Sequence, residues 1–141
     1  MVMKLIFCSV TTLPTKHRKR IHKDMCYNMG GMDYAIRHRF RNHRLALLTL
    51  RDKIISWGSL IIGNYGKAPK YCVWVWTDKN HRKRGYAKLC IKSLLDKYLI
   101  SKTVCMGVFS KVTAKIVRGL GGRPVMQYWD PPAVMKWSRR D

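Results

Sequence analysis

Residues 79–88 combine basic side chains with small residues in an arrangement suited to an anionic ligand. Residues 73–77 before them read as a strand, and an amphipathic run to Leu99 reads as a helix whose first residues are Arg84 and Gly85. The helix dipole favours anions rather than cations at a helix start, so the basic residues here predict an anionic guest such as a phosphate. They are Lys79, Arg82, Lys83, Arg84 and Lys88. Small residues at Gly85 and Ala87 let backbone N–H groups approach a pyrophosphate closely.

The spacing Arg82-x-x-Gly85-x-Ala87 resembles the Gln/Arg-x-x-Gly-x-Gly/Ala signature of the GNAT superfamily of N-acetyltransferases. The pattern follows a predicted strand and opens a predicted helix, which is the context that such a motif requires. A solvated basic helix start with a turn glycine is the alternative. The resemblance implies acetyl-CoA as the acetyl-donating cosubstrate, with pantetheine on the strand backbone and pyrophosphate on the loop and helix start. The matching cofactor-binding positions are Val75, Trp76, Thr77, Arg82, Lys83, Arg84, Gly85, Tyr86, Ala87 and Lys88.

Catalytic residues must be sought outside the family's usual set. The chain contains no Glu, and Arg118 replaces the Tyr that often protonates the leaving thiolate in this family; its charge is an alternative means of stabilising the thiolate. Acetyl transfer needs a deprotonated amine and a polarised thioester carbonyl. The catalytic candidates are Asp78 at the strand end and His81 in the loop, with Asp52 and Asp130 as further options in turns. Ion pairing, loop exposure and turn formation are the plainer explanations of these four residues. An amine of low pKa would react largely through proximity.

Charge sets this composition apart. The chain carries 29 Lys and Arg against 7 acidic residues, all of them Asp, for a formal net charge of +22. Such a field attracts polyanions, so nucleic acid is the predicted partner, ahead of an anionic membrane surface. An ordinary solvated surface mixes both signs in similar numbers, whereas the basic N-terminal part contains very few acidic residues. The predicted nucleic-acid-binding residues are Arg18, Lys19, Arg20, Lys23, Arg37, Arg39, Arg41 and Arg44.

The predicted elements alternate between strands and helices, without an internal repeat or a linker. Strands are expected at residues 4–10, 45–50, 53–62, 71–77, 104–109, 124–129 and 134–137, and helices at about 15–29, 32–42, 84–99 and 111–120. This order resembles the whole GNAT fold. It predicts one GNAT-like domain over residues 1–141, in the α/β class (α+β type), with a mixed, mostly antiparallel central sheet flanked by helices on both faces.

Apolar stripes indicate which helix faces are buried. In the helix after the motif, the expected buried residues are Ala87, Cys90, Ile91, Leu94, Leu95 and Tyr98. In the helix near the C-terminus, the expected inward residues are Val112, Ile116, Val117 and Leu120.

Five widely spaced cysteines without a Cys-x-x-Cys motif indicate neither a disulfide framework nor a zinc ribbon. His22 and Cys26 lie one helical turn apart but have no third ligand, so no metal is predicted. The N-terminus lacks the features of a signal peptide, and no apolar stretch reaches membrane-spanning length. We therefore expect reduced, mostly buried thiols and a cytoplasmic protein, in the host cytoplasm if the chain is viral.

The leading hypothesis is an acetyl-CoA-dependent N-acetyltransferase whose acceptor is an amine on nucleic acid or presented by it, such as a charged tRNA or a modified base. One alternative is a protein N-acetyltransferase acting on a nucleic-acid-associated protein, or on a host defence or transcription protein. Another is a catalytically silent nucleic-acid-binding module, which the missing Glu and Tyr keep open. The sequence leaves the oligomeric state open.

Overall fold

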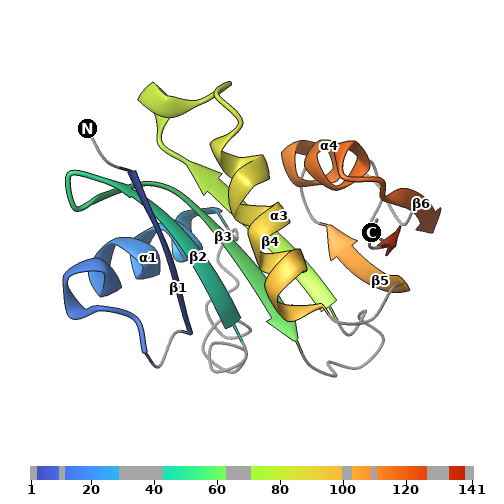
Figure 1. The fold of residues 1–141 in the computed structure, drawn as a ribbon, viewed down its shortest axis with the longest axis horizontal. Helices are drawn as coiled ribbons and strands as arrows, with labels where there is room; N and C mark the ends of the chain where they lie inside the picture. Colours follow the sequence, from blue (N-terminus) through green and yellow to red (C-terminus); the bar gives the residue numbers. More distant parts are fainter. Residues whose placement is uncertain are drawn as a thin grey trace.

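The computed structural model describes residues 3–9, 12–28, 43–62, 71–99, 103–108, 111–126 and 134–138. Their strands form one seven-stranded sheet in the order β1-β2-β3-β4-β5-β7-β6 (Figure 1). The strands are β1 (Met3–Ser9), β2 (His43–Leu50), β3 (Lys53–Ile62), β4 (Tyr71–Thr77), β5 (Thr103–Val108), β6 (Arg123–Met126) and β7 (Val134–Ser138). The helices are α1 (Thr15–Asn28), the short 3-10 helix η2 (Lys79–His81), α3 (Tyr86–Tyr98) and α4 (Lys111–Gly119). Neighbouring strands are antiparallel except β4 and β5, which are parallel.

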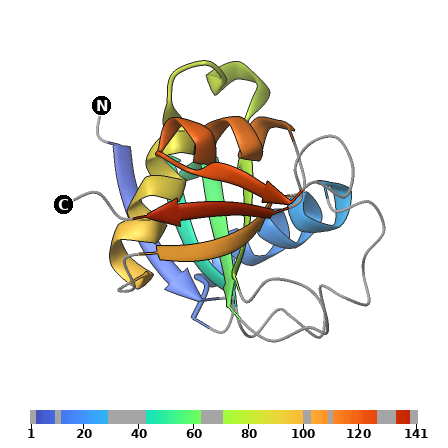
Figure 2. The ribbon, with the colours of Figure 1, turned by 90° about the vertical axis from the view of Figure 1, so that its right-hand side faces the viewer.

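Helices cover both faces of the sheet, with α1 and α3 on opposite sides (Figure 2). Side chains alternate between the faces of a strand, so the apolar strand β2 supplies both layers of the core. Ala46 and Leu48 pack in the cluster that includes α3, whereas Leu45 and Leu47 pack in the cluster that includes Ile21 of α1. The unbroken apolar run of β2 thus reflects burial on both faces.

Helix α3 lies close against β3 because Gly58 has no side chain. A Cβ at Gly58 would lie 3.2 Å from the Cβ of Cys90 and 3.2 Å from the Cδ1 atoms of Ile91 and Leu94. Those three side chains are fully buried. This close packing sets the position of the α3 N-terminus relative to the end of β4.

The predicted fold class is confirmed, because the sheet is mixed, mostly antiparallel and flanked by helices on both faces. The predicted hairpin between β2 and β3 is also confirmed. Its turn residues Arg51 and Asp52 have φ of 52° and 63°, as expected for a tight turn that matches the strand twist. The two cysteines with described side chains, Cys8 and Cys90, are free and buried. Burial raises the pKa of each thiol to about 11.

Two predictions about helices were wrong in detail. Helix α3 begins at Tyr86 rather than Arg84, because Gly85 adopts φ 79° and acts as the N-cap. In α4, Val112 is 61% exposed instead of facing inward. The buried residues of that helix are Thr113, Ala114 and Val117, since the helix presents its other apolar side to a cavity described below.

Several predictions lie outside the described residues. They are the helix at 32–42 with Arg37, Arg39 and Arg41, the turn residue Asp130, and the side chains of His22 and Cys26.

Candidate active site

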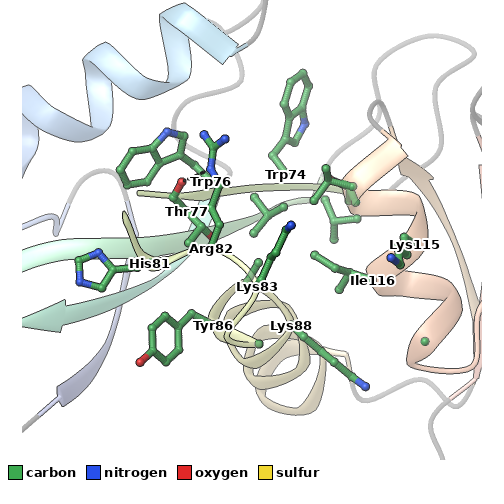
Figure 3. Close-up of a pocket in the computed structure, with 17 residues that line it drawn as sticks. Trp74, Trp76, Thr77, His81, Arg82, Lys83, Tyr86, Lys88, Lys115 and Ile116 are labelled. Carbon is green, nitrogen blue, oxygen red and sulfur yellow. Dashed lines mark hydrogen bonds between the residues drawn. The ribbon is translucent and has the colours of Figure 1, made fainter. Parts of the chain in front are cut away.

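A cavity of about 820 Å³ lies beside the stretch of β4 that extends beyond its pairing with β5. The parallel pairing of the two strands covers residues 71–73 only, and residues 74–77 continue past it. Those residues line the cavity together with the loop after β4, the start of α3 and one side of α4 (Figure 3). The cavity thus lies where two strands of the sheet part.

The backbone of Val75 and Thr77 presents polar groups to this cavity. The N–H of Asp78 donates to the carbonyl of Ile55 on β3, at 2.8 Å. Successive residues of a strand direct their backbone groups to opposite sides, so Trp76 also faces β3 while Val75 and Thr77 face away from it. The Nε of Arg82 donates to the Thr77 carbonyl at 3.2 Å, which agrees with that direction. The N–H groups of Val75 and Thr77 therefore point toward the parting of the strands.

The start of α3 provides a second set of backbone donors. Gly85 caps the helix with φ 79°, no side chain caps the first turn, and that turn contains no acidic residue. The positive φ of Gly85 is the reason for a glycine here, because a side chain would have room: a Cβ at this position would meet nothing within 4 Å. The space above the helix start is therefore open. Gly85, Tyr86, Ala87 and Lys88 all line the cavity. Unpaired N–H groups and the helix dipole make such a helix start an anion-binding site.

Four cationic side chains line the cavity: Arg82, Lys83, Lys88 and Lys115. None of the described residues that line it is acidic. The Nζ of Lys88 reaches to within 3.9 Å of the position that a Cβ of Gly119 would take on α4. Since the cavity wall has only positive charge, it favours an anionic ligand.

The residues singled out from the motif fall into two groups. Val75, Trp76, Thr77, Arg82, Lys83, Gly85, Tyr86, Ala87 and Lys88 line the cavity. Arg84 is exposed and does not line it, because the turn before Gly85 carries its side chain outside. Arg118 is likewise exposed and outside the lining.

The two catalytic candidates bind each other. The Nδ1 of His81 lies 3.0 Å from Oδ2 of Asp78, and this hydrogen bond is the main reason why the pKa of Asp78 lies below its ordinary value. His81 lines the cavity, whereas Asp78 is not among the residues that line it. Asp52 lies in the exposed β2–β3 turn and binds Lys16 at 3.3 Å, away from the cavity lining.

The cavity also reaches the α1 face of the sheet. Trp74 and Trp76 point toward α1, whereas Tyr86 and Lys88 lie on the other side of β4 (Figure 3). The Arg20 guanidinium of α1 stacks over the Trp76 ring, 4.6 Å from its centroid, and lies 4.0 Å from the Asp78 carboxylate. We call the part with Trp74, Trp76 and Arg82 the aromatic half, and the part with Lys83, Lys88, Lys115 and the α3 start the basic half.

Sequence reasoning missed the aromatic half as a unit. It assigned Trp76 a backbone role and Arg20 a role in phosphate binding. The one available signal was the alternation Trp74-x-Trp76, which places both indoles on one face of a strand. Their contact with Arg20 depends on how α1 packs, which no local pattern gives.

Helix α1 carries most of the predicted nucleic-acid-binding residues that are described. Arg18, Lys19, Arg20 and Lys23 are exposed, and Arg44 is half-buried on β2. The opposite side of the helix is buried through His17 and Ile21. The exposed surface of α1 is therefore strongly cationic.

Within the described ranges, no helix combines the length and apolar character needed to cross a bilayer. The same ranges contain no group of three or more His, Cys, Asp or Glu side chains arranged to hold a metal ion.

No protein-family model matches the sequence, and no curated protein matches it. Solved structures match it over nearly the whole chain. Escherichia coli ElaA has a TM-score of 0.74 at 13% identity, covering 97% of this chain and 100% of that one. YncA of Salmonella typhimurium, whose structure contains its cofactor acetyl-CoA, has a TM-score of 0.63 at 10% identity, covering 100% and 96%. An acetyltransferase of the GNAT family from Streptococcus pneumoniae has a TM-score of 0.61 at 9% identity, covering 96% and 100%. The chain therefore has the fold of the GNAT acetyltransferases.

Proposed function

We propose that the protein is a single-domain, acetyl-CoA-dependent N-acetyltransferase. One observation carries the proposal: the cavity joins a polar strand edge to a basic helix start where β4 and β5 part. Acetyl-CoA has matching parts, since its pantetheine carries amides and its diphosphate carries negative charge. YncA, which has the same fold and contains acetyl-CoA, supports this assignment.

The basic half binds the phosphates of the coenzyme. The diphosphate accepts hydrogen bonds from the first N–H groups of α3, where the missing side chain of Gly85 allows close approach. Lys83, Lys88 and Lys115 neutralise its charge.

The strand edge binds the pantetheine and the thioester. The backbone of Val75 pairs with a pantetheine amide, while the exposed Val112 and the half-buried Ile116 of α4 cover its apolar parts. The N–H of Thr77 donates to the thioester carbonyl oxygen. A fixed donor at that oxygen stabilises the charge that develops there in the transition state.

Transfer occurs by attack of the acceptor nitrogen on the thioester carbonyl carbon. The N–C bond forms, the C–S bond breaks, the thiolate leaves, and the amine gives up a proton. His81 is the side chain placed to take that proton, and Asp78 orients its ring. Proximity of the two reactants supplies most of the acceleration, because it converts a bimolecular step into an effectively unimolecular one.

The acceptor amine is carried by nucleic acid or presented by it, as on a charged tRNA or a modified base. Three observations support this: the net charge of +22, the exposed cations of α1, and the absence of acidic residues from the described cavity lining. A free polyamine or a lysine-rich peptide would be repelled by such a surface. Nucleic acid would be attracted to it.

The experiment is acetyl transfer from radiolabelled acetyl-CoA. Charged tRNA, uncharged tRNA, single-stranded RNA and DNA, and a basic protein are each offered as acceptors at matched salt. We expect label in a nucleic-acid fraction, and none with Gly85→Asp, which should not bind the coenzyme. Label in the protein acceptor alone would favour the protein N-acetyltransferase alternative. Nucleic-acid binding without transfer to any acceptor would favour the silent binding module.

A further inference from the structure

The aromatic half has features that its role next to a coenzyme does not require. Trp74 and Trp76 are only half-buried and both line the cavity, so part of each side chain faces open space. Arg20 is held against Trp76 by a cation–π contact of 4.6 Å and by the Asp78 carboxylate at 4.0 Å. These contacts fix a planar guanidinium beside an indole, at the end of β4.

Positive charge surrounds these flat groups. The side chain of Arg82 extends past Thr77 toward the side where Trp76 lies (Figure 3). Arg18, Lys19 and Lys23 are exposed on the helix that carries Arg20. The one carboxylate nearby that the structure describes, Asp78, is engaged by Arg20 and His81. A cationic guest would therefore find little compensation here, whereas a flat, anionic guest would find both stacking surfaces and countercharges.

An unpaired nucleotide is the chemical class that fits both features. Unstacked bases bind proteins by stacking on aromatic rings and on arginine planes. Lys and Arg side chains bind the adjoining phosphates. A base inside a duplex has both of its faces covered by its neighbours and could not make the stacking contact.

We propose that the aromatic half binds an unpaired base of single-stranded nucleic acid. The base stacks on Trp74 beside the Arg20 guanidinium, and the flanking phosphates bind Arg18, Lys19 and Lys23. The inference rests on the proposed function for one consequence only, namely that the reactive amine is carried by the bound nucleotide or by a group attached to it. The binding itself is measured without acetyl transfer.

The probe is a short oligonucleotide with a central 2-aminopurine, whose fluorescence falls when the base stacks. RNA and DNA versions are compared with the same strand in a duplex and with a strand that lacks the central base. We expect the protein to quench the fluorescence of the RNA or the DNA single strand and to bind the strand without the central base more weakly. Adding protein to the duplex should cause no quenching beyond that of the free duplex. The comparison of RNA with DNA identifies the natural source of the base.

Variants at position 74 separate stacking from packing. Trp74→Phe keeps an aromatic ring, whereas Trp74→Leu keeps an apolar side chain without one. We expect Trp74→Leu to abolish the quenching and weaken binding about tenfold, and Trp74→Phe to retain most of both. Lys92→Ala on the solvent face of α3, where Lys92 pairs with Asp96, is the matched control and should change neither. Thermal unfolding checks that each variant folds.

Two results would overturn the inference: equal quenching and affinity in wild type and Trp74→Leu, or equal affinity for strands with and without the central base. Wild-type protein that binds acetyl-CoA but no single strand would also overturn it while leaving the proposed function intact. Base-dependent binding by a protein that does not bind acetyl-CoA would refute the proposed function and leave this inference standing.

Discussion

The two halves of the cavity are built in different ways. The basic half comes largely from one contiguous segment, residues 83–88, and its important groups are the backbone N–H groups of the helix start that Gly85 caps. The aromatic half is made of side chains from α1, β4 and the loop after it, with Arg20 in contact with both Trp76 and Asp78. A site formed by the backbone of one short segment is determined by the sequence of that segment. A site formed by side chains that are far apart in the sequence depends on how whole helices and strands pack.

The helices that support the two halves also pack differently. Helix α3 docks through four fully buried side chains, Cys90, Ile91, Leu94 and Leu95. Among the side chains of α1 that the structure describes, Ile21 and His17 are buried. His17 is 4% exposed, and its Nε2 has no hydrogen-bond partner among the described residues. A buried polar atom without a partner costs free energy. The aromatic half is therefore supported by a helix contact that contains this buried polar atom.

The largest expected effect is a loss of acetyl-CoA affinity on substitution of Gly85, which belongs to the basic half alone. Gly85→Asp places a negative charge in the open space above the helix start, where the diphosphate is proposed to bind. Two like charges about 4 Å apart repel by about 4 kcal/mol at an effective dielectric constant of 20. Acetyl-CoA affinity should fall a hundredfold or more, about 3 kcal/mol, in titration calorimetry.

The uncharged variant Gly85→Asn is the matched control, because Asn also tolerates a positive φ and has nearly the same size. It should lose much less affinity than Gly85→Asp. Both variants should bind single-stranded oligonucleotide like the wild type. Equal losses in the two variants would show that space, not charge, controls this half.

The converse variant removes the α1 cations. Replacing Arg18, Lys19 and Lys23 by Ala should weaken oligonucleotide binding and flatten its dependence on salt, because each phosphate contact releases counterions. The log–log slope should decrease by about two units on a single strand. Acetyl-CoA affinity should not change.

A control triple variant removes Lys53, Lys92 and Arg123, which are exposed elsewhere on the chain. It should change the slope much less. If both triple variants flatten the slope equally, the α1 surface has no special role and net charge alone binds the nucleic acid.

A smaller effect is expected between the two halves, at the pair formed by Asp78 and His81. If proximity dominates catalysis, His81→Ala and Asp78→Asn should each lower turnover by about tenfold, and by less than the ~100-fold or more typical of a lost general base. The hydrogen bond from His81 lowers the pKa of Asp78, so the carboxylate stays ionised at neutral pH. Single-turnover rates at saturating acetyl-CoA test this. A loss far above a hundredfold for either variant would identify a true general base.

The smallest effect concerns the support of α1. Burial is the main cause that lowers the pKa of His17 below its usual 6.5. The positive charge of Lys16 lowers it further, and the negative charge of Asp52 raises it in part. Above pH 6.5 the folded and unfolded chains both keep this imidazole neutral. Below it the unfolded chain binds the proton first, so stability falls with pH by at most about 1.4 kcal/mol per unit.

Denaturant unfolding of wild type and His17→Leu between pH 5 and 8 measures this contribution as a difference. The wild type should lose more stability on acidification than the variant. Parallel stability curves would show that His17 does not make α1 the pH-sensitive side of the fold.

The fold and the basic half were largely predictable because their signals are local. The strand β4, the glycine before α3 and the turn at Arg51 and Asp52 each have a residue pattern tied to one conformation. The start of α3 was misplaced because the cation at Arg84 looks like part of an anion-binding helix, whereas the conformation of Gly85 delays the helix start by two residues, to Tyr86. Val112 was misplaced because a cavity and a core both favour apolar side chains.

The aromatic half was not predictable in the same way. Arg20 and Trp76 are far apart in the sequence, and neither residue has a neighbour that marks the contact. Their meeting depends on the orientation of α1, which packs through Ile21 in a cluster with residues of β2 and β3. Such a contact follows from tertiary structure alone.

Acetyl-CoA binding by the wild-type protein tests the central claim most directly. Titration calorimetry should show one site per chain, and acetyl-CoA at about a hundred times its dissociation constant should stabilise the fold by about 2.7 kcal/mol in thermal unfolding. Pantetheine without the nucleotide should bind much more weakly, because it lacks the phosphates for the basic half. No heat of binding and no thermal shift at millimolar acetyl-CoA would contradict the account, since the cavity where β4 and β5 part would then serve another ligand.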